Sequence, residues 1–164
     1  MATIEEIKKA RVAKLERIQK KGLLPYPGEI QRTHSLSELL KGFPVLSKAQ
    51  TEVIGVGRIR TIREHGGSTF FHIEDGTASM QAYLKEDRVG EAPYQFFLEN
   101  IDIGDFIQLR GVLFSTKRGE KTLEVADYKI LAKSLLPLPE KWHGLQDEEE
   151  RYRKRYLDIL LTKD

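Results

Sequence analysis

The side chains of this sequence best suited to binding chemistry are aromatic and polar residues on two predicted neighbouring strands. Alternation over residues 69–74 places Phe71 on one face of a strand and Phe70 with His72 on the other. Two adjacent phenylalanines cannot both enter one core. Phe70 is therefore either covered by an N-terminal segment or exposed as a platform on which a base can stack. On the next predicted strand, Gln81 offers a donor and an acceptor to the edge of an unstacked base, or simply faces solvent.

Charged residues near these strands suit contacts with nucleic acid. Arg58, Arg60 and Arg63 form a local cationic patch, which would contact phosphates or pair with neighbouring carboxylates. We expect Arg58 and Arg60 on one side of a strand and Arg63 at the entrance to the following turn. Glu120 lies in a predicted hairpin turn, where it could accept from an exocyclic amine or a base N–H. A glutamate in a turn is more often simply solvated.

The sequence contains no recognisable catalytic constellation. It has no phosphate-binding glycine loop followed by lysine, no nucleophile elbow and no plausible histidine–carboxylate–nucleophile set. The absence of cysteine excludes disulfides, thiolate metal sites and a cysteine nucleophile. The four histidines are scattered without metal-binding spacing. We therefore predict no catalytic residue and no metal site in this chain.

Composition indicates a folded protein with one core and appendages. The 164 residues are 40% hydrophobic and 32% charged, and the formal net charge is only +2, so the distribution of charge must indicate the partners. The longest apolar runs are far shorter than the roughly 18 residues needed to span a bilayer. The lysine-rich N-terminus lacks the features of a secretory signal. We expect a cytoplasmic protein without membrane contact.

The residue patterns predict helices before and within a set of strands. A capping box beginning at Thr3 starts a basic helix over about residues 3–21, which is either packed by its apolar stripe or in contact with phosphates. A second short helix over residues 34–40 would be ended by Gly42 and Pro44. Strands are predicted over residues 53–62, 69–74, 79–84, 106–114 and 123–131, with a short helix over residues 92–100.

Five strands with a helix between the third and fourth predict a mainly β fold with helices (α+β), namely a five-stranded OB-fold barrel. Such barrels bind oligonucleotides on strands two and three and on adjacent loops. A small SH3-like barrel is the structural alternative, although the position of the helix favours the OB arrangement. We expect a helical extension over residues 1–48, the barrel over 49–133, and a linker with the start of another domain over 134–164. The acidic run at 147–150, followed by basic residues, indicates a helix start.

Longer motifs lie along nearly the whole chain, over residues 22–27, 32–39, 56–59, 135–147 and 151–158. They resemble the N-terminal anticodon-binding region of bacterial-type class II lysyl-tRNA synthetases. The barrel is shared with aspartyl and asparaginyl relatives. The Pro25-Tyr26-Pro27 segment after a basic helix and the linker over residues 143–147 favour the lysyl member.

The resemblance implies that the barrel binds the anticodon of tRNA(Lys). It implies a stacking role for Phe70, a base-reading role for Gln81 and an anticodon contact for Glu120 in the hairpin. Arg63 and Arg58 resemble the arginines near the base that is read.

His72 occupies the adjacent outward position, where the family commonly has a smaller residue, so its role is open. The N-terminal basic helix resembles one that adds tRNA contacts. The predicted RNA-binding residues are Arg58, Arg63, Phe70, His72, Gln81 and Glu120.

The same resemblance implies that the chemistry belongs to another part of a longer enzyme. In the family, the segment after the linker enters a catalytic domain that uses ATP and Mg²⁺ to attach lysine to tRNA(Lys), and the full-length enzymes are usually homodimers. The signature motifs of that domain are missing from these 164 residues. We therefore expect no cofactor for this chain and no formation of aminoacyl-adenylate by it alone. The alternatives are a stand-alone OB-fold single-stranded nucleic-acid-binding protein and a module that mainly forms a dimer interface.

Overall fold

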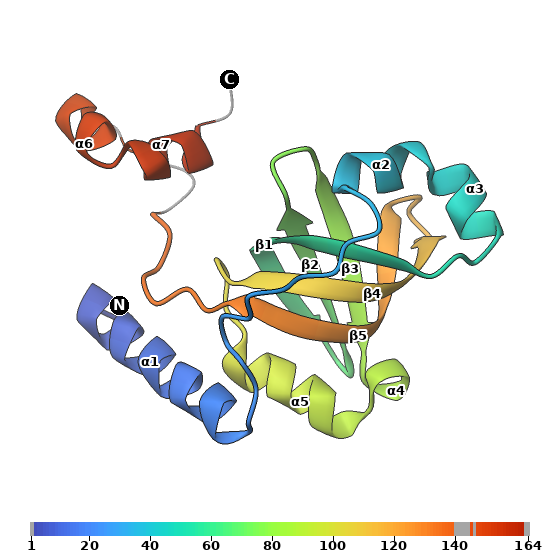
Figure 1. Cartoon of the computed structure of the whole chain (residues 1–164), viewed down its shortest axis with the longest axis horizontal. Coiled ribbons are helices and arrows are strands. Elements are labelled where there is room, and N and C mark those ends of the chain that lie inside the picture. Colours follow the sequence, from blue (N-terminus) through green and yellow to red (C-terminus); the bar gives the residue numbers. More distant parts are fainter. Residues whose placement is uncertain (1, 140–144, 146, 163–164) are drawn as a thin grey trace.

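Five strands close into a barrel with helices at its edges and ends (Figure 1). The computed structural model describes residues 2–139, 145 and 147–162. The strands are β1 Val53–His65, β2 Ser68–Glu74, β3 Ser79–Lys85, β4 Phe106–Ser115 and β5 Lys121–Ala132. The helices are α1 Ile4–Lys20, α2 Leu36–Lys41, α3 Phe43–Lys48, α4 Glu86–Val89, α5 Glu91–Asn100, α6 Glu148–Arg153 and α7 Arg155–Leu161.

Around the barrel the strands follow the order β1-β2-β3-β5-β4, and β4 returns to pair with β1. All neighbouring strands are antiparallel except β3 and β5, which pair in parallel from Gln81 opposite Thr122 to Tyr83 opposite Glu124. Helices α4 and α5 connect β3 to β4, and α5 is the helix that the sequence predicts there. This arrangement is that of an OB-fold, so the predicted five-stranded α+β fold is confirmed.

The barrel core forms because apolar side chains alternate along each strand. In β2, Phe71 and Ile73 point inward and are only 0% and 1% exposed, and the Phe71 ring lies 5.1 Å from that of Phe97 on α5. Gly111 lies where β4 approaches β5 closely, and a Cβ at this position would overlap the carbonyl oxygen of Glu124. The approach of the two backbones therefore requires glycine.

Capping side chains and a proline set the starts of the first helices. Thr3 and Glu6 bond reciprocally to each other's backbone at the start of α1, as predicted, and α2 begins with the same arrangement. Gly42 ends α2 as predicted. Pro44, however, lies in the first turn of α3, a helix that the sequence did not predict. Proline is tolerated there because its missing N–H would have no partner within the helix.

Helix α1 uses basic side chains to dock beside α5 and on the end of the barrel (Figure 1). Arg11 is largely buried, and its Nη1 donates to the carbonyl oxygens of Ser134 and Leu136 at 3.3 and 3.1 Å. Lys14 Nζ lies 2.6 Å from Asp102 Oδ1. Part of the basic face that could have met phosphates is therefore used inside the protein.

A buried ion pair closes the same end of the barrel. Lys133 Nζ lies 2.7 Å from Asp105 Oδ2 and 2.6 Å from Asp102 Oδ2, and the side chains of Lys133 and Asp105 are 0% exposed. Burial raises the pKa of Asp105 despite the nearby Lys133 charge. Burial acts in the same direction on Asp102, but hydrogen bonds from Lys133 and Lys14 outweigh it and hold the pKa of Asp102 below its ordinary value. The cluster joins α1, the loop before β4 and the end of β5.

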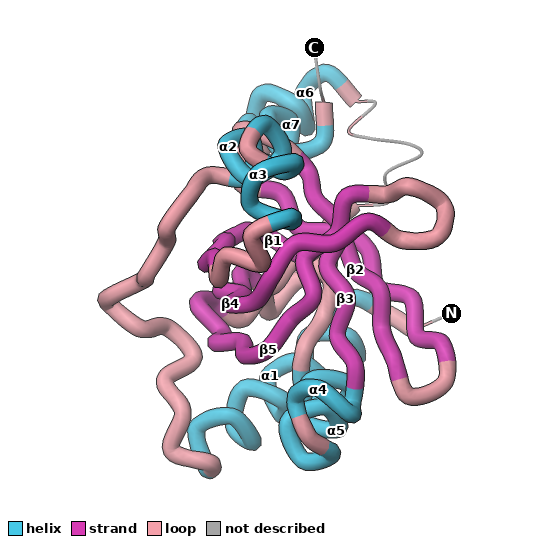
Figure 2. Tube along the Cα trace, turned by 90° about the vertical axis from the view of Figure 1, so that its right-hand side faces the viewer, coloured by secondary structure: helices cyan, strands magenta, loops and turns pink. Residues whose placement is uncertain are grey.

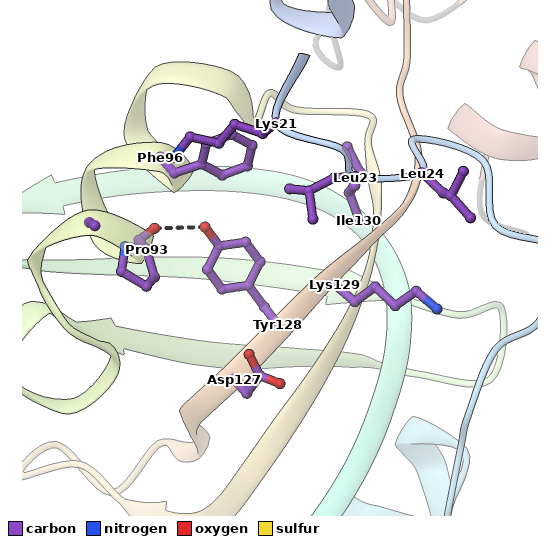
Figure 3. A pocket seen from close by; sticks show the side chains of 10 residues that line it. Lys21, Leu23, Leu24, Pro93, Phe96, Asp127, Tyr128, Lys129 and Ile130 are labelled. Carbon is purple, nitrogen blue, oxygen red and sulfur yellow. Dashed lines mark hydrogen bonds between the residues drawn. The ribbon is translucent and has the colours of Figure 1, made fainter. Parts of the chain in front are cut away.

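A groove of about 310 Å³ lies between the segment after α1, helix α5 and strand β5 (Figure 3). Lys21 Nζ lies 4.8 Å from the centre of the Phe96 ring, and Leu23 adds apolar lining. The Tyr128 hydroxyl donates to the carbonyl oxygen of Pro93 at 2.6 Å, and burial raises the pKa of Tyr128. These contacts fasten the chain after α1 to α5 and β5.

Helix α6 begins as the charge pattern predicts, whereas the start of the separate helix α7 was not predicted. Asp147 caps α6, since its Oδ1 accepts from the backbone N–H of Glu149 at 3.0 Å. Acidic residues fill the first turn of α6 and basic residues its last turn, which complements the helix dipole. Residues 143, 144 and 146 of the predicted linker motif lie outside the described residues.

Candidate nucleic-acid interface

Strands β1, β2 and β3 lie next to one another (Figure 2), and β5 follows β3 in the barrel. Two rows of side chains cross the outer side of these four strands. Each row follows from the strand register, because directly paired residues project from the same side of a sheet. The polar row consists of Thr61, His72, Gln81 and Thr122. The aromatic row, displaced by two residues along β2, consists of Arg63, Phe70, Tyr83 and Glu124.

The aromatic row contains a pair of stacked rings. The Phe70 and Tyr83 rings lie 4.6 Å apart at 30°, and the Phe114 ring lies 6.0 Å from Tyr83. Phe70 is partly exposed, whereas Phe71 is enclosed in the core. The two adjacent phenylalanines therefore point to opposite sides of the barrel wall, as the alternation predicted. Phe70 presents a supported aromatic surface to which a base can add.

A β-bulge in β1 determines which arginine accompanies Phe70. The pairing between β1 and β2 shifts between Ile59 and Thr61, so the inward and outward positions exchange after the shift. Arg63 consequently lies on the outer side, directly opposite Phe70. Because β1 continues to His65, Arg63 belongs to the strand, and its expected position at the entrance to a turn was wrong.

The polar row is tied together by hydrogen bonds. His72 Nδ1 lies 3.1 Å from Thr61 Oγ1, and His72 Nε2 lies 3.1 Å from Glu120 Oε1 in the β4–β5 hairpin. Gln81 Nε2 donates to Thr122 Oγ1 at 2.9 Å, and Gln81 is only 4% exposed. The predicted residues His72, Gln81 and Glu120 therefore lie together beside the stacked rings.

Arg58 is the predicted residue that the structure places apart. In the register of β1 and β2 it lies opposite Glu74, at the end of β2 away from Phe70. Its guanidinium lies 4.5 Å from the centre of the Phe106 ring. Burial lowers the pKa of Arg58, and the neighbouring charge of Arg60 acts in the same direction. The expected cationic patch is thus divided, with Arg63 beside the aromatic row and Arg58 packed against β4.

Four residues of the rows were not among the predicted site residues, namely Thr61, Tyr83, Thr122 and Glu124. Tyr83 could have been found, since it alternates with the apolar residues of β3 and is aromatic on an outer position. Thr122 gave no such signal, because its place beside Gln81 depends on the parallel pairing of β3 with β5. No residue of either row lines the groove beside α5.

Within the described residues, no group of three or more histidine, aspartate or glutamate side chains is placed to hold a metal ion. No helix in the described part of the chain is long and apolar enough to cross a membrane.

Comparison with known proteins shows which proteins this chain is similar to. Residues 53–131 match a family model, tRNA_anti-codon, described as an OB-fold nucleic acid binding domain. The lysine–tRNA ligase of Thermosipho melanesiensis is 39% identical over 165 residues, which cover 98% of this chain and 33% of that protein. The lysine–tRNA ligase of Carboxydothermus hydrogenoformans is 42% identical over 161 residues, which cover 98% of this chain and 32% of that protein. This chain has an OB-fold anticodon-binding domain, and its homologues are lysine–tRNA ligases.

The predicted resemblance to lysyl-tRNA synthetases is therefore confirmed over nearly the whole chain. The chain spans about a third of the length of the curated relatives it matches. Both rows lie within the OB-fold match at residues 53–131, whereas α1 and the C-terminal helices lie outside it. The domain that carries the nucleic-acid-binding description is thus the one that carries the stacked rings and the polar row.

Proposed function

We propose that this chain is the tRNA-binding part of a lysine–tRNA ligase and that its two rows hold the anticodon of tRNA(Lys). The observation that supports this most directly is the stacked pair Phe70 and Tyr83 adjoining Gln81 and Glu120. Sequence-specific RNA binding commonly uses this combination, in which an aromatic surface holds an unstacked base and polar groups bond to its edge.

The proposed roles follow from the chemistry of each side chain. A base stacked on Phe70 would gain roughly 1–3 kcal/mol, without preference among the bases. Gln81 and Glu120 supply the preference, because they can bond to the polar edge of the base. Arg63, opposite Phe70, is positioned to neutralise a phosphate. Arg58 would contact only the RNA backbone, at a point farther from the stacked base.

The division of labour in the longer protein is also a proposal. We propose residues 49–133 as the anticodon-binding domain, residues 1–48 as its helical extension and residues 134–164 as the connection to a catalytic domain. Activation of lysine with ATP and Mg²⁺ would belong to that domain, in a homodimeric cytoplasmic enzyme. Accordingly, this chain alone should show no lysine-dependent ATP–pyrophosphate exchange, and a measurable rate would contradict the proposal.

The decisive experiment compares two anticodon stem-loops, one with the anticodon UUU and one with UCU. Binding is measured by fluorescence anisotropy at fixed salt, because phosphate contacts alone make any affinity salt-dependent. Leaving one buried polar group without a suitable hydrogen-bond partner in the complex costs about 1–3 kcal/mol of binding free energy. The UCU loop should therefore bind about 5- to 150-fold more weakly than the UUU loop. Equal affinities would instead support a stand-alone single-strand binder. If neither loop binds, the interpretation of the barrel as a dimer-forming module would be favoured.

A further inference from the structure

The orientation of the Gln81 side-chain amide is fixed by a chain of hydrogen bonds. The carbonyl oxygen of Glu120 can only accept, so the Thr122 hydroxyl, 3.1 Å away, must donate its single proton to it. The Thr122 oxygen can then only accept from Gln81, 2.9 Å away. Gln81 must therefore direct its Nε2 amino group toward Thr122.

This leaves Gln81 Oε1 as the free acceptor of the amide, while Nε2 keeps one further N–H. Oε1 accepts no hydrogen bond from the described residues, although Gln81 as a whole is 4% exposed. Arg60 Nη1 is the one side-chain nitrogen or oxygen in the described part of the chain that is fully buried without a hydrogen-bond partner. Oε1 is consequently not sealed inside the protein and remains open toward the surface.

The surroundings of Gln81 add a second acceptor. Glu120 uses Oε1 to bond to His72 Nε2 and retains Oε2. With the Gln81 amide fixed and a carboxylate beside it, the polar row presents acceptors to a ligand. Such a row suits a base that carries an N–H at the centre of its Watson–Crick edge and disfavours one that carries a bare ring nitrogen there.

We propose that Thr122 is a positioning residue for base selection: by holding the Gln81 amino group, it turns the Gln81 carbonyl toward the base and favours uracil, with its N3–H, over cytosine, with its unprotonated N3. This inference rests on the proposed function of the barrel. Without the Thr122 hydroxyl, the amide can rotate by half a turn and offer its amino group to cytosine N3. Selectivity would then fall while stacking on Phe70 is retained.

The test compares Thr122→Val with Thr122→Ser, binding the UUU and UCU stem-loops by fluorescence anisotropy. Valine has nearly the same shape but no hydroxyl, whereas serine keeps the hydroxyl and loses a methyl group. We expect Thr122→Val to reduce the preference for UUU about tenfold, mainly by tighter binding of UCU, and Thr122→Ser to keep the preference of the unaltered chain. A purely structural effect would weaken both loops together and leave their ratio unchanged, which would overturn the inference.

A second measurement needs no substitution and covers the case in which Thr122→Val does not fold. Nuclear Overhauser contacts between the Gln81 side-chain amide protons and the Thr122 methyl group should be present in the unaltered chain and persist when the UUU loop is bound. Their absence would contradict the fixed amide. Failure of the unaltered chain to distinguish UUU from UCU would instead contradict the proposed function, so the two failures are separable.

Discussion

Replacing Phe70 by alanine should mainly weaken RNA binding, whereas replacing the adjacent Phe71 by alanine should mainly lower stability. The Phe70 ring lies on the outer side of β2, 4.6 Å from Tyr83, whereas the Phe71 ring is 0% exposed and packs against Phe97. Phe70→Ala therefore removes a binding surface, and Phe71→Ala empties part of the core. The two substitutions are chemically identical, so each serves as the matched control for the other.

The two substitutions should differ in how much unfolding free energy and how much RNA affinity they lose. Phe70→Ala loses the stacking pair with Tyr83, worth about 0.5–1.5 kcal/mol of stability, which lowers Tm by a few degrees. It also loses base stacking of roughly 1–3 kcal/mol, which weakens binding of the UUU loop about 5- to 150-fold. Phe71→Ala should cost about 3–5 kcal/mol of stability, because a buried phenyl ring leaves a cavity.

Thermal unfolding followed by circular dichroism and anisotropy titration of the UUU loop would measure both effects, with titrations made at a temperature where each variant is folded. Folded Phe71→Ala should bind the loop within about twofold of the unaltered chain. Unchanged affinity in Phe70→Ala would refute stacking at this position. Equal destabilisation by the two substitutions would refute the assignment of the two rings to opposite sides of the barrel wall.

Three further predictions concern the charged groups. Lys133→Met should cost about 3–5 kcal/mol of unfolding free energy in urea titrations, because Asp105 would be left buried without its partner; the double variant with Asp105→Asn should recover part of this loss, and no recovery would contradict the pairing. Asp102→Asn should be less stable than the unaltered chain near pH 6. Since the folded-state pKa of Asp102 lies below its ordinary 3.8, the stabilisation is present above that value and lost as pH falls through the folded pKa, so the difference should shrink as the pH is lowered below 3.8. His72→Ala should weaken binding of the UUU loop about two- to fivefold because Glu120 is no longer held at 3.1 Å, whereas His72→Asn, which keeps a donor, should bind more nearly as the unaltered chain does; identical affinities for all three would show that the bond is unimportant.

The sequence predicted the parts of the interface that depend on local alternation. The opposite orientations of Phe70 and Phe71 follow from the period of two along a strand, and the structure has them as expected. The capping box at Thr3 was likewise predictable, because its two partners lie three residues apart. Whether these residues bind RNA stays a prediction.

Features that depend on pairing between distant strands could not be predicted. The shift between Ile59 and Thr61 that brings Arg63 beside Phe70 has no signal in a single strand, since it exists only relative to β2. Arg11 illustrates the same limit in a helix. Its pattern suits a phosphate contact, but the carbonyl oxygens that it binds lie 92 to 125 residues away along the chain.

The polar row owes its arrangement to the closure of the barrel. Its members come from β1, β2, β3 and β5, and they become neighbours only when β3 and β5 pair. That pairing is confined to the positions from Gln81 to Tyr83, so the hydrogen bond from Gln81 to Thr122 belongs both to the barrel seam and to the proposed base-reading group. An opening of the seam would therefore release the Gln81 amide while Phe70 and Tyr83, on the antiparallel pair β2 and β3, stay stacked. Base selection should consequently be lost at a lower denaturant concentration than base stacking, because selection needs the closed seam and stacking does not.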